Sequence, residues 1–146
     1  MVPTPPAVTA LAQRLEEVGW VSELWVGGSL ATGDYVPGVS DLDLVALVDD
    51  DMSGPRREVL RRIHTELDRR TAAGAQLGCV YVDAARLLDR AAEHPTWTHG
   101  SMVDRILSGV GLAELVRHGY AVLGRPPDGV LPPMTDDDVR EAARAR

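Results

Sequence analysis

Two aspartates one residue apart, Asp41 and Asp43, open an apolar run of the chain. Alternate residues of a strand project from the same face, so these carboxylates point the same way, with Cα atoms about 6.5–7 Å apart. Carboxylates held this close repel each other, and partial burial makes ionising them more costly. A divalent cation offsets both effects, and Mg²⁺ is commonly held by one or two carboxylates with phosphate oxygens and water. The pair therefore predicts a metal site that a phosphate-bearing ligand completes.

A glycine- and serine-containing turn lies upstream of the aspartate pair. Gly27, Gly28 and Ser29 follow an apolar run, where the chain must turn sharply. Glycines let a ligand approach the backbone closely, and successive N–H groups at a turn attract anions. The Ser29 hydroxyl can donate to a phosphate oxygen, and Ser40, just before the aspartates, is a further candidate. We therefore expect Gly28, Ser29 and Ser40 to bind phosphate groups near the cation.

The elements that must position these groups follow from hydrophobic periodicity. Segments with the apolar stripe of a helix alternate with short apolar segments typical of buried strands along most of the chain. The predicted helices are 6–18, 54–70, 83–94, 111–118 and 136–146, and the predicted strands are 21–26, 42–48, 77–82 and 120–123. This alternation predicts an α/β (α+β) fold, in which helices pack on a small mixed β-sheet of about four to five strands. We expect residues 1–130 to form the main domain, followed by a proline-rich exit and terminal helix over 131–146.

Composition limits the classes of function. The chain has 146 residues, which suits one domain, and its net charge of −7 argues against a long nucleic acid as partner. No apolar run approaches the roughly 20 residues that span a bilayer. The single cysteine, Cys79, cannot form an internal disulfide, which favours a reducing, cytoplasmic location. All 15 basic residues are arginines, so the chain has no lysine for a phosphate-binding Walker loop. His64 lies among the arginines of the 54–70 helix, where we expect it to be solvated.

Two stretches carry a family resemblance. "GGSLATGDYVPGVSDLDLVALV", residues 27–48, resembles the nucleotidyltransferase superfamily that includes DNA polymerase β, and within it the aminoglycoside adenylyltransferases. "LAELVRHGYAVLGRPPDGVLPPMTDDDVREA", residues 112–142, is similar to the helix, strand and proline-rich exit that close the catalytic domain of those enzymes. The resemblance therefore covers nearly the whole chain, and its Gly-Ser and Asp-x-Asp parts are the most specific.

The resemblance implies an antibiotic-resistance enzyme of the nucleotidyltransferase type. With Mg²⁺ as cofactor, it would move a nucleoside monophosphate, AMP from ATP, to a hydroxyl of a small molecule such as an aminoglycoside-like antibiotic. Asp41 and Asp43 would be the catalytic metal ligands. Gly28 and Ser29 would bind the β- and γ-phosphates.

One catalytic position departs from the family pattern. The relatives carry a third acidic residue on a later strand, and the matching position here is Gly78. Asp83 is the nearest candidate for the missing catalytic carboxylate. It lies five residues further on, an odd separation that places it on the opposite face of a regular strand. The alternative role for Asp83 is to cap the helix that follows it.

The length of the chain leaves two further alternatives open. The antibiotic-modifying relatives carry an additional helical domain that builds much of the acceptor site. Here a homodimer, a small helical partner protein or a segment beyond this chain would have to complete it. The chain could instead be a minimal, antitoxin-type nucleotidyltransferase that modifies a partner protein. It could also be a nucleotide-binding module without catalysis, because of Gly78.

Overall fold

The computed structural model describes residues 4–36, 41–49, 54–70, 77–107 and 109–132, and six strands in these ranges form one mixed sheet. The strand order is β5-β4-β3-β2-β1-β6, and β2 and β3 run parallel while the other neighbours are antiparallel. The strands are β1 Val21–Val26, β2 Leu42–Val48, β3 Leu77–Asp83, β4 Glu93–Thr98, β5 Ser101–Ile106 and β6 Tyr120–Leu123. The predicted mixed sheet with packed helices is confirmed, although the sheet has more strands than expected.

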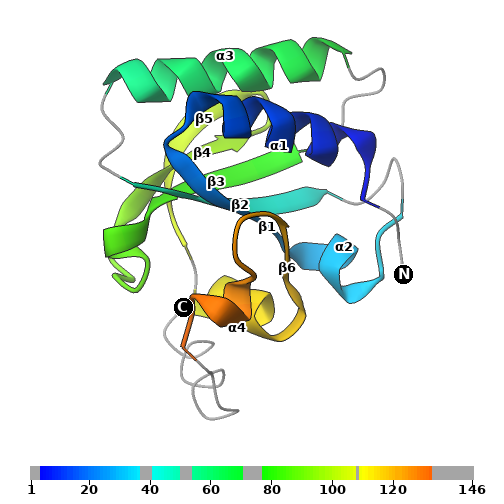
Figure 1. Cartoon of the computed structure of the whole chain (residues 1–146), viewed down its shortest axis with the longest axis vertical. Helices are drawn as coiled ribbons and strands as arrows, with labels where there is room; N and C mark the ends of the chain where they lie inside the picture. Colours follow the sequence, from blue (N-terminus) through cyan, green and yellow to red (C-terminus); the bar gives the residue numbers. More distant parts are fainter. Residues whose placement is uncertain (1–3, 37–40, 50–53, 71–76, 108, 133–146) are drawn as a thin grey trace.

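Helices cover both faces of this sheet. The two long helices, α1 (Pro6–Val18) and α3 (Gly54–Arg70), lie side by side over one face (Figure 1). On the other side lies α4 (Gly109–His118), and the short α2 (Gly28–Thr32) follows β1 and contacts α4. Two 3₁₀ turns, η1 (Ala84–Arg86) and η2 (Pro127–Gly129), complete the described elements. No described helix is long and apolar enough to cross a membrane.

The side chains of β2 alternate between two apolar clusters, which explains its nearly continuous apolar sequence. One cluster lies under α1 and α3 and includes Leu11, Leu15, Leu60, Ile63, Leu42, Leu44, Ala46 and Val48. The other lies on the α4 side and includes Trp25, Val45, Leu47, Leu112 and Leu115. Asp43 has the parity of Val45 and Leu47, so its side chain belongs to the face that α4 covers.

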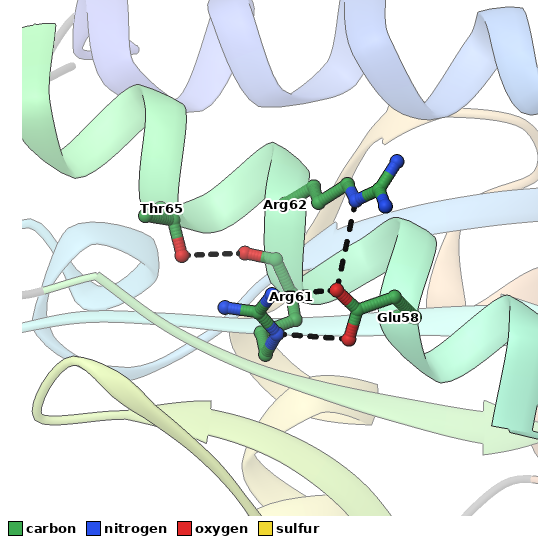
Figure 2. A network of polar contacts seen from close by, with 4 residues as sticks. All are labelled: Glu58, Arg61, Arg62 and Thr65. Carbon is green, nitrogen blue, oxygen red and sulfur yellow. Dashed lines mark hydrogen bonds and ion pairs between the residues drawn. The ribbon is translucent and has the colours of Figure 1, made fainter.

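The exposed face of α3 carries arginines that pair within the helix. Glu58 accepts from Arg61 at 2.5 and 2.9 Å, and its Oε1 lies 3.6 Å from Nε of Arg62 (Figure 2). One turn further on, the Thr65 hydroxyl donates to the Arg61 carbonyl at 2.7 Å. These solvated pairs add little stability individually. They give α3 a surface of mixed charge.

The predicted position of His64 was wrong. This side chain is fully buried beneath α3, its Nε2 lies 2.5 Å from the Tyr81 hydroxyl, and its ring stacks on Trp97 with centroids 5.2 Å apart. Nδ1 of His64 has no hydrogen-bond partner among the described residues. Burial accordingly lowers the pKa of His64 to about 3, so the ring is neutral in the folded protein at physiological pH.

The helix predicted over 83–94 was also wrong. After the single 3₁₀ turn of η1 the chain enters β4, which pairs with β5 through a hairpin. His99 and Gly100 have φ values of 49° and 77°, as a two-residue hairpin turn with left-handed central residues requires. Pro95 is tolerated within β4 because β3 pairs with β4 only through residues 96 and 97. The helix predicted over 136–146 lies outside the described residues.

Candidate functional site

The glycine turn and the aspartate pair meet at one end of the sheet. Because β1 and β2 are antiparallel neighbours, the end of β1 lies beside the start of β2. Val26 is registered with Leu44, and the Gly27 N–H donates to the Asp43 carbonyl at 2.8 Å. This pairing brings the two candidate elements, the glycine turn and the aspartate pair, to the same end of the sheet.

Asp43 and Gly28 are in direct contact. Gly28 has a left-handed φ of 60°, and a Cβ built on it would overlap Oδ2 of Asp43 and lie 3.2 Å from its Cγ. Glycine therefore satisfies two requirements at this position, because it adopts the left-handed conformation and leaves room for the carboxylate. The Asp43 carboxylate lies directly against the first residue of α2.

Three negative charges share this part of the molecule. Partial burial raises the pKa of the Asp43 carboxyl above its ordinary value, and the charges of Asp41 and Glu114 raise it further. Asp41 is exposed just before β2, whereas Glu114 comes from α4. A bound cation would offset the repulsion among these carboxylates and favour their ionised forms.

A pocket of about 280 Å³ opens beside Asp43, between the sheet and α4. The strand ends supply one side of it and α4 supplies the other. Its lining includes Gly27, Gly28, Asp43, Gly78, Thr96, Thr98, Arg105, Leu107, Gly111, Glu114 and Leu115. The pocket thus has an acidic part around Asp43, and Arg105 introduces a basic side chain from β5. Its volume suits part of a nucleotide or a sugar-sized molecule.

The two positions considered for a third carboxylate, Gly78 and Asp83, lie at opposite ends of β3. Gly78 is registered with Asp43 on the parallel neighbour β3, so position 78 does lie beside the aspartate and carries no carboxylate. Asp83 is registered with Val48 at the other end of the strand, about 16 Å along it from Gly78 by strand rise. Its Oδ1 accepts from the Ala85 N–H at 3.0 Å and caps η1. The structure therefore does not bring Asp83 to the pocket, and its alternative role as a cap is the one observed.

The two predicted serines have different outcomes. Ser29 is half-buried in the first turn of α2, directly after Gly28. Its carbonyl accepts from the Asp34 N–H at 2.9 Å, which closes the turn that follows. Ser40 lies outside the described residues. Gly28 thus lies against Asp43, and Ser29 is the next residue of α2.

The two aspartates supply only part of the ligand set that a magnesium ion needs. Asp41 and Asp43 offer the hard carboxylate oxygens that Mg²⁺ prefers. Within the described ranges no group of three or more His, Cys, Asp or Glu side chains could hold a metal ion. Such a site would draw two ligands from these aspartates, and phosphate and water oxygens would supply the others. This donor set agrees with a metal that binds together with a triphosphate.

Sequence reasoning missed the contribution of α4. Gly111, Glu114 and Leu115 all line the pocket, and their i, i+3, i+4 spacing places them on one helix face. The available signal was an acidic residue between Leu112 and Leu115 in an otherwise apolar stretch.

A small mixed sheet with a glycine-serine turn facing an Asp-x-Asp pair on the next strand is the architecture of nucleotidyltransferases. Residues 8–78 match the family described as nucleotidyltransferase domain. Over these residues the chain is similar to the nucleotidyltransferase family. A direct comparison with curated proteins gave no significant match.

A solved structure shows the same fold. The spectinomycin adenyltransferase AAD(9) from Enterococcus faecialis, solved with ATP and spectinomycin, superposes with a TM-score of 0.67 at 14% identity over 91% of this chain. The present chain spans 60% of the length of that enzyme. A toxin–antitoxin structure with AMP-PNP gives a TM-score of 0.46 at 16% identity, over 94% of this chain and 85% of its own, which is too low to support an argument.

Proposed function

We propose that this chain transfers a nucleoside monophosphate from a magnesium-bound triphosphate to a hydroxyl of a small, aminoglycoside-like acceptor. The nucleoside monophosphate in this proposal is AMP, transferred from ATP. The observation that carries the proposal is the contact between Asp43 and Gly28, which joins the acidic pair to the turn suited to phosphate. The fold shared with spectinomycin adenyltransferase, which was solved with ATP and spectinomycin, supports the same assignment.

Each residue at this end of the sheet has a role in the proposal. Asp41 and Asp43 bind the metal, and Gly28 and Ser29 donate hydrogen bonds to the β- and γ-phosphates, with Ser40 as a further nucleotide contact. Bound Mg²⁺ would offset the negative charge that develops on the leaving pyrophosphate. The part of the pocket lined by Thr96 and Arg105 remains for the acceptor or the nucleoside.

Charge supports an acceptor that carries amino groups. The chain has a net charge of −7, and two acidic side chains, Asp43 and Glu114, line the pocket together with one basic side chain, Arg105. Clefts in which one sign of charge predominates concentrate ligands of the opposite sign and raise their association rates. A cationic amino sugar fits this field better than an anionic acceptor does.

A second candidate function is nucleotide binding without transfer. The observation that favours it is Gly78, which lies beside Asp43 where the relatives carry a third acidic residue. If that carboxylate is indispensable, the chain binds a magnesium triphosphate and releases no pyrophosphate.

One assay separates the two candidates. The protein is incubated with ATP, Mg²⁺ and a panel of amino-sugar acceptors, and pyrophosphate release is followed, with Asp43→Asn as the inactive control. Acceptor-dependent release by the wild type alone supports transfer. Binding of the magnesium triphosphate without release with any acceptor contradicts transfer and supports the second candidate.

A further inference from the structure

The face of α4 that lines the pocket is fixed in place by packing. Leu115 is 3% exposed, and its Cδ2 lies 3.3 Å from where a Cβ on Gly27 would stand. This contact ties α4 to the residue whose N–H binds the Asp43 carbonyl. Glu114, the preceding residue, is therefore held on a wall of the same pocket as Asp43.

Two glycines leave space that a carboxylate from α4 can use. Gly78, beside Asp43, contributes no side chain to the pocket. Gly111 lies one helical turn before Glu114 on the same wall and also contributes none. A side chain from α4 can therefore occupy space that neither β3 nor the preceding turn of the helix fills.

The contacts of Glu114 favour a role in proton transfer over metal binding. In the described part of the chain, Glu114 belongs to no group of three potential metal ligands. No hydrogen bond or ion pair to a described residue engages its carboxylate, which is exposed at the pocket. A carboxylate that no described residue engages can accept a proton from a hydroxyl bound in the same pocket.

We propose that Glu114 is the general base of the reaction and replaces the carboxylate that position 78 lacks. The inference rests on the proposed function. The acceptor oxygen forms a bond to the α-phosphorus while the bond from that phosphorus to the oxygen bridging to the β-phosphate breaks. Pyrophosphate leaves with the electrons of the broken bond, and the proton of the acceptor hydroxyl passes to the Glu114 carboxylate.

The direct test is Glu114→Gln, compared with Glu17→Gln on the exposed surface of α1 as a matched control. We expect Glu114→Gln to lower kcat for pyrophosphate release about 100-fold or more, which is the range of general-base catalysis. We expect the rise in Tm that ATP with Mg²⁺ produces to remain unchanged, because the variant keeps the metal and phosphate contacts. Glu17→Gln should match the wild type in both measurements.

A rescue experiment separates a base from a structural residue. A Cβ on Gly78 would lie 3.6 Å from the Trp97 carbonyl oxygen and 3.7 Å from that of Leu42, so the position can accept a side chain. Adding Gly78→Glu to Glu114→Gln should restore kcat at least tenfold.

Several results would overturn the inference. They are a kcat for Glu114→Gln within threefold of the wild type, a loss of the triphosphate-induced Tm rise in that variant, or no rescue by Gly78→Glu. A wild type that is inactive until Gly78→Glu is introduced would also overturn it, because the missing carboxylate would then belong on β3. A wild type and Gly78→Glu variant that both bind triphosphate, yet release no pyrophosphate with any acceptor, would contradict the proposed function itself.

Discussion

The carboxylate of Asp43 lies against Gly28, so closely that no side chain can be added to the glycine without displacing it. The hydrogen bond from Gly27 to the Asp43 carbonyl holds the two strands in the register that produces this contact. A phosphate bound at the turn and a cation bound at the aspartate would therefore be neighbours. This relationship determines what substitutions at the turn should do.

Gly28→Ala should remove binding of the magnesium triphosphate. The added methyl group would meet Oδ2 of Asp43, and a left-handed non-glycine residue costs about 1–3 kcal/mol of stability. Gly33→Ala is the matched control, because Gly33 has a φ of 87° and open space around its Cβ position. Both variants should lose stability in denaturant titrations, and only Gly28→Ala should lose the triphosphate-induced rise in Tm. Equal Tm rises in the two variants would contradict the contact.

Leu115→Ala should destabilise the protein by about 2–5 kcal/mol, as is usual when a buried leucine is truncated. The loss would leave a cavity between α4 and Gly27. Leu88→Ala, at a leucine that is 63% exposed, should change the free energy of unfolding by about 0.5 kcal/mol or less. Urea denaturation of both variants measures the difference, and similar values for the two would contradict the packing of α4.

His64 should make stability depend on pH. Its pKa is about 3 in the folded protein, against an ordinary value of 6.5. Between these values the unfolded chain takes up a proton that the folded protein does not bind. The free energy of unfolding should therefore fall as the pH drops below about 6.5, by up to about 1.4 kcal/mol per pH unit.

Urea titrations from pH 7.5 to pH 5 measure this slope, in a range where unshifted carboxylates stay mostly ionised. His64→Gln should have a shallower slope than the wild type, and His118→Gln, at an exposed position, should not. An unchanged slope in His64→Gln would show that this ring is not the group responsible.

Asp83 should affect stability without affecting nucleotide binding. Its side chain caps η1 at the far end of β3, so Asp83→Ala should cost about 0.5–2 kcal/mol. Asp83→Asn keeps an oxygen acceptor and should cost less. Affinity for the magnesium triphosphate, measured by calorimetry, should stay at the wild-type value in both variants. A tenfold loss of affinity in either variant would indicate that Asp83 does take part in nucleotide binding.

Much of the fold could be predicted because its signals are local. The apolar stripe of α1 and the short apolar run of β2 gave their observed bounds, Pro6–Val18 and Leu42–Val48. The β4–β5 hairpin was missed because its alanine-rich approach was interpreted as a helix that Pro95 ends. Pairing with β5 decides the conformation of that segment, and pairing between strands is not visible in local periodicity.

Only the residues of the two motifs, the glycine-serine turn and the Asp-x-Asp pair, could be predicted as site residues from the sequence. The contact between Gly28 and Asp43 depends on β1 and β2 being neighbours in the sheet. Local sequence patterns do not show which strands pair, and the structure shows that these two do. Glu114 could not be found, because the side of the sheet that a helix covers depends on packing of the whole chain. His64 was misplaced since the arginines around it hid its position on the buried stripe of α3.

The most direct test of the account is calorimetric titration of ATP with Mg²⁺ into the wild type and into Asp41→Asn and Asp43→Asn, repeated with EDTA in place of the metal. The account predicts magnesium-dependent binding to the wild type and an affinity at least about 100-fold lower for each variant. Equal binding by all three proteins, or binding that EDTA leaves unchanged, would contradict the claim that the aspartate pair and the glycine turn hold a magnesium triphosphate.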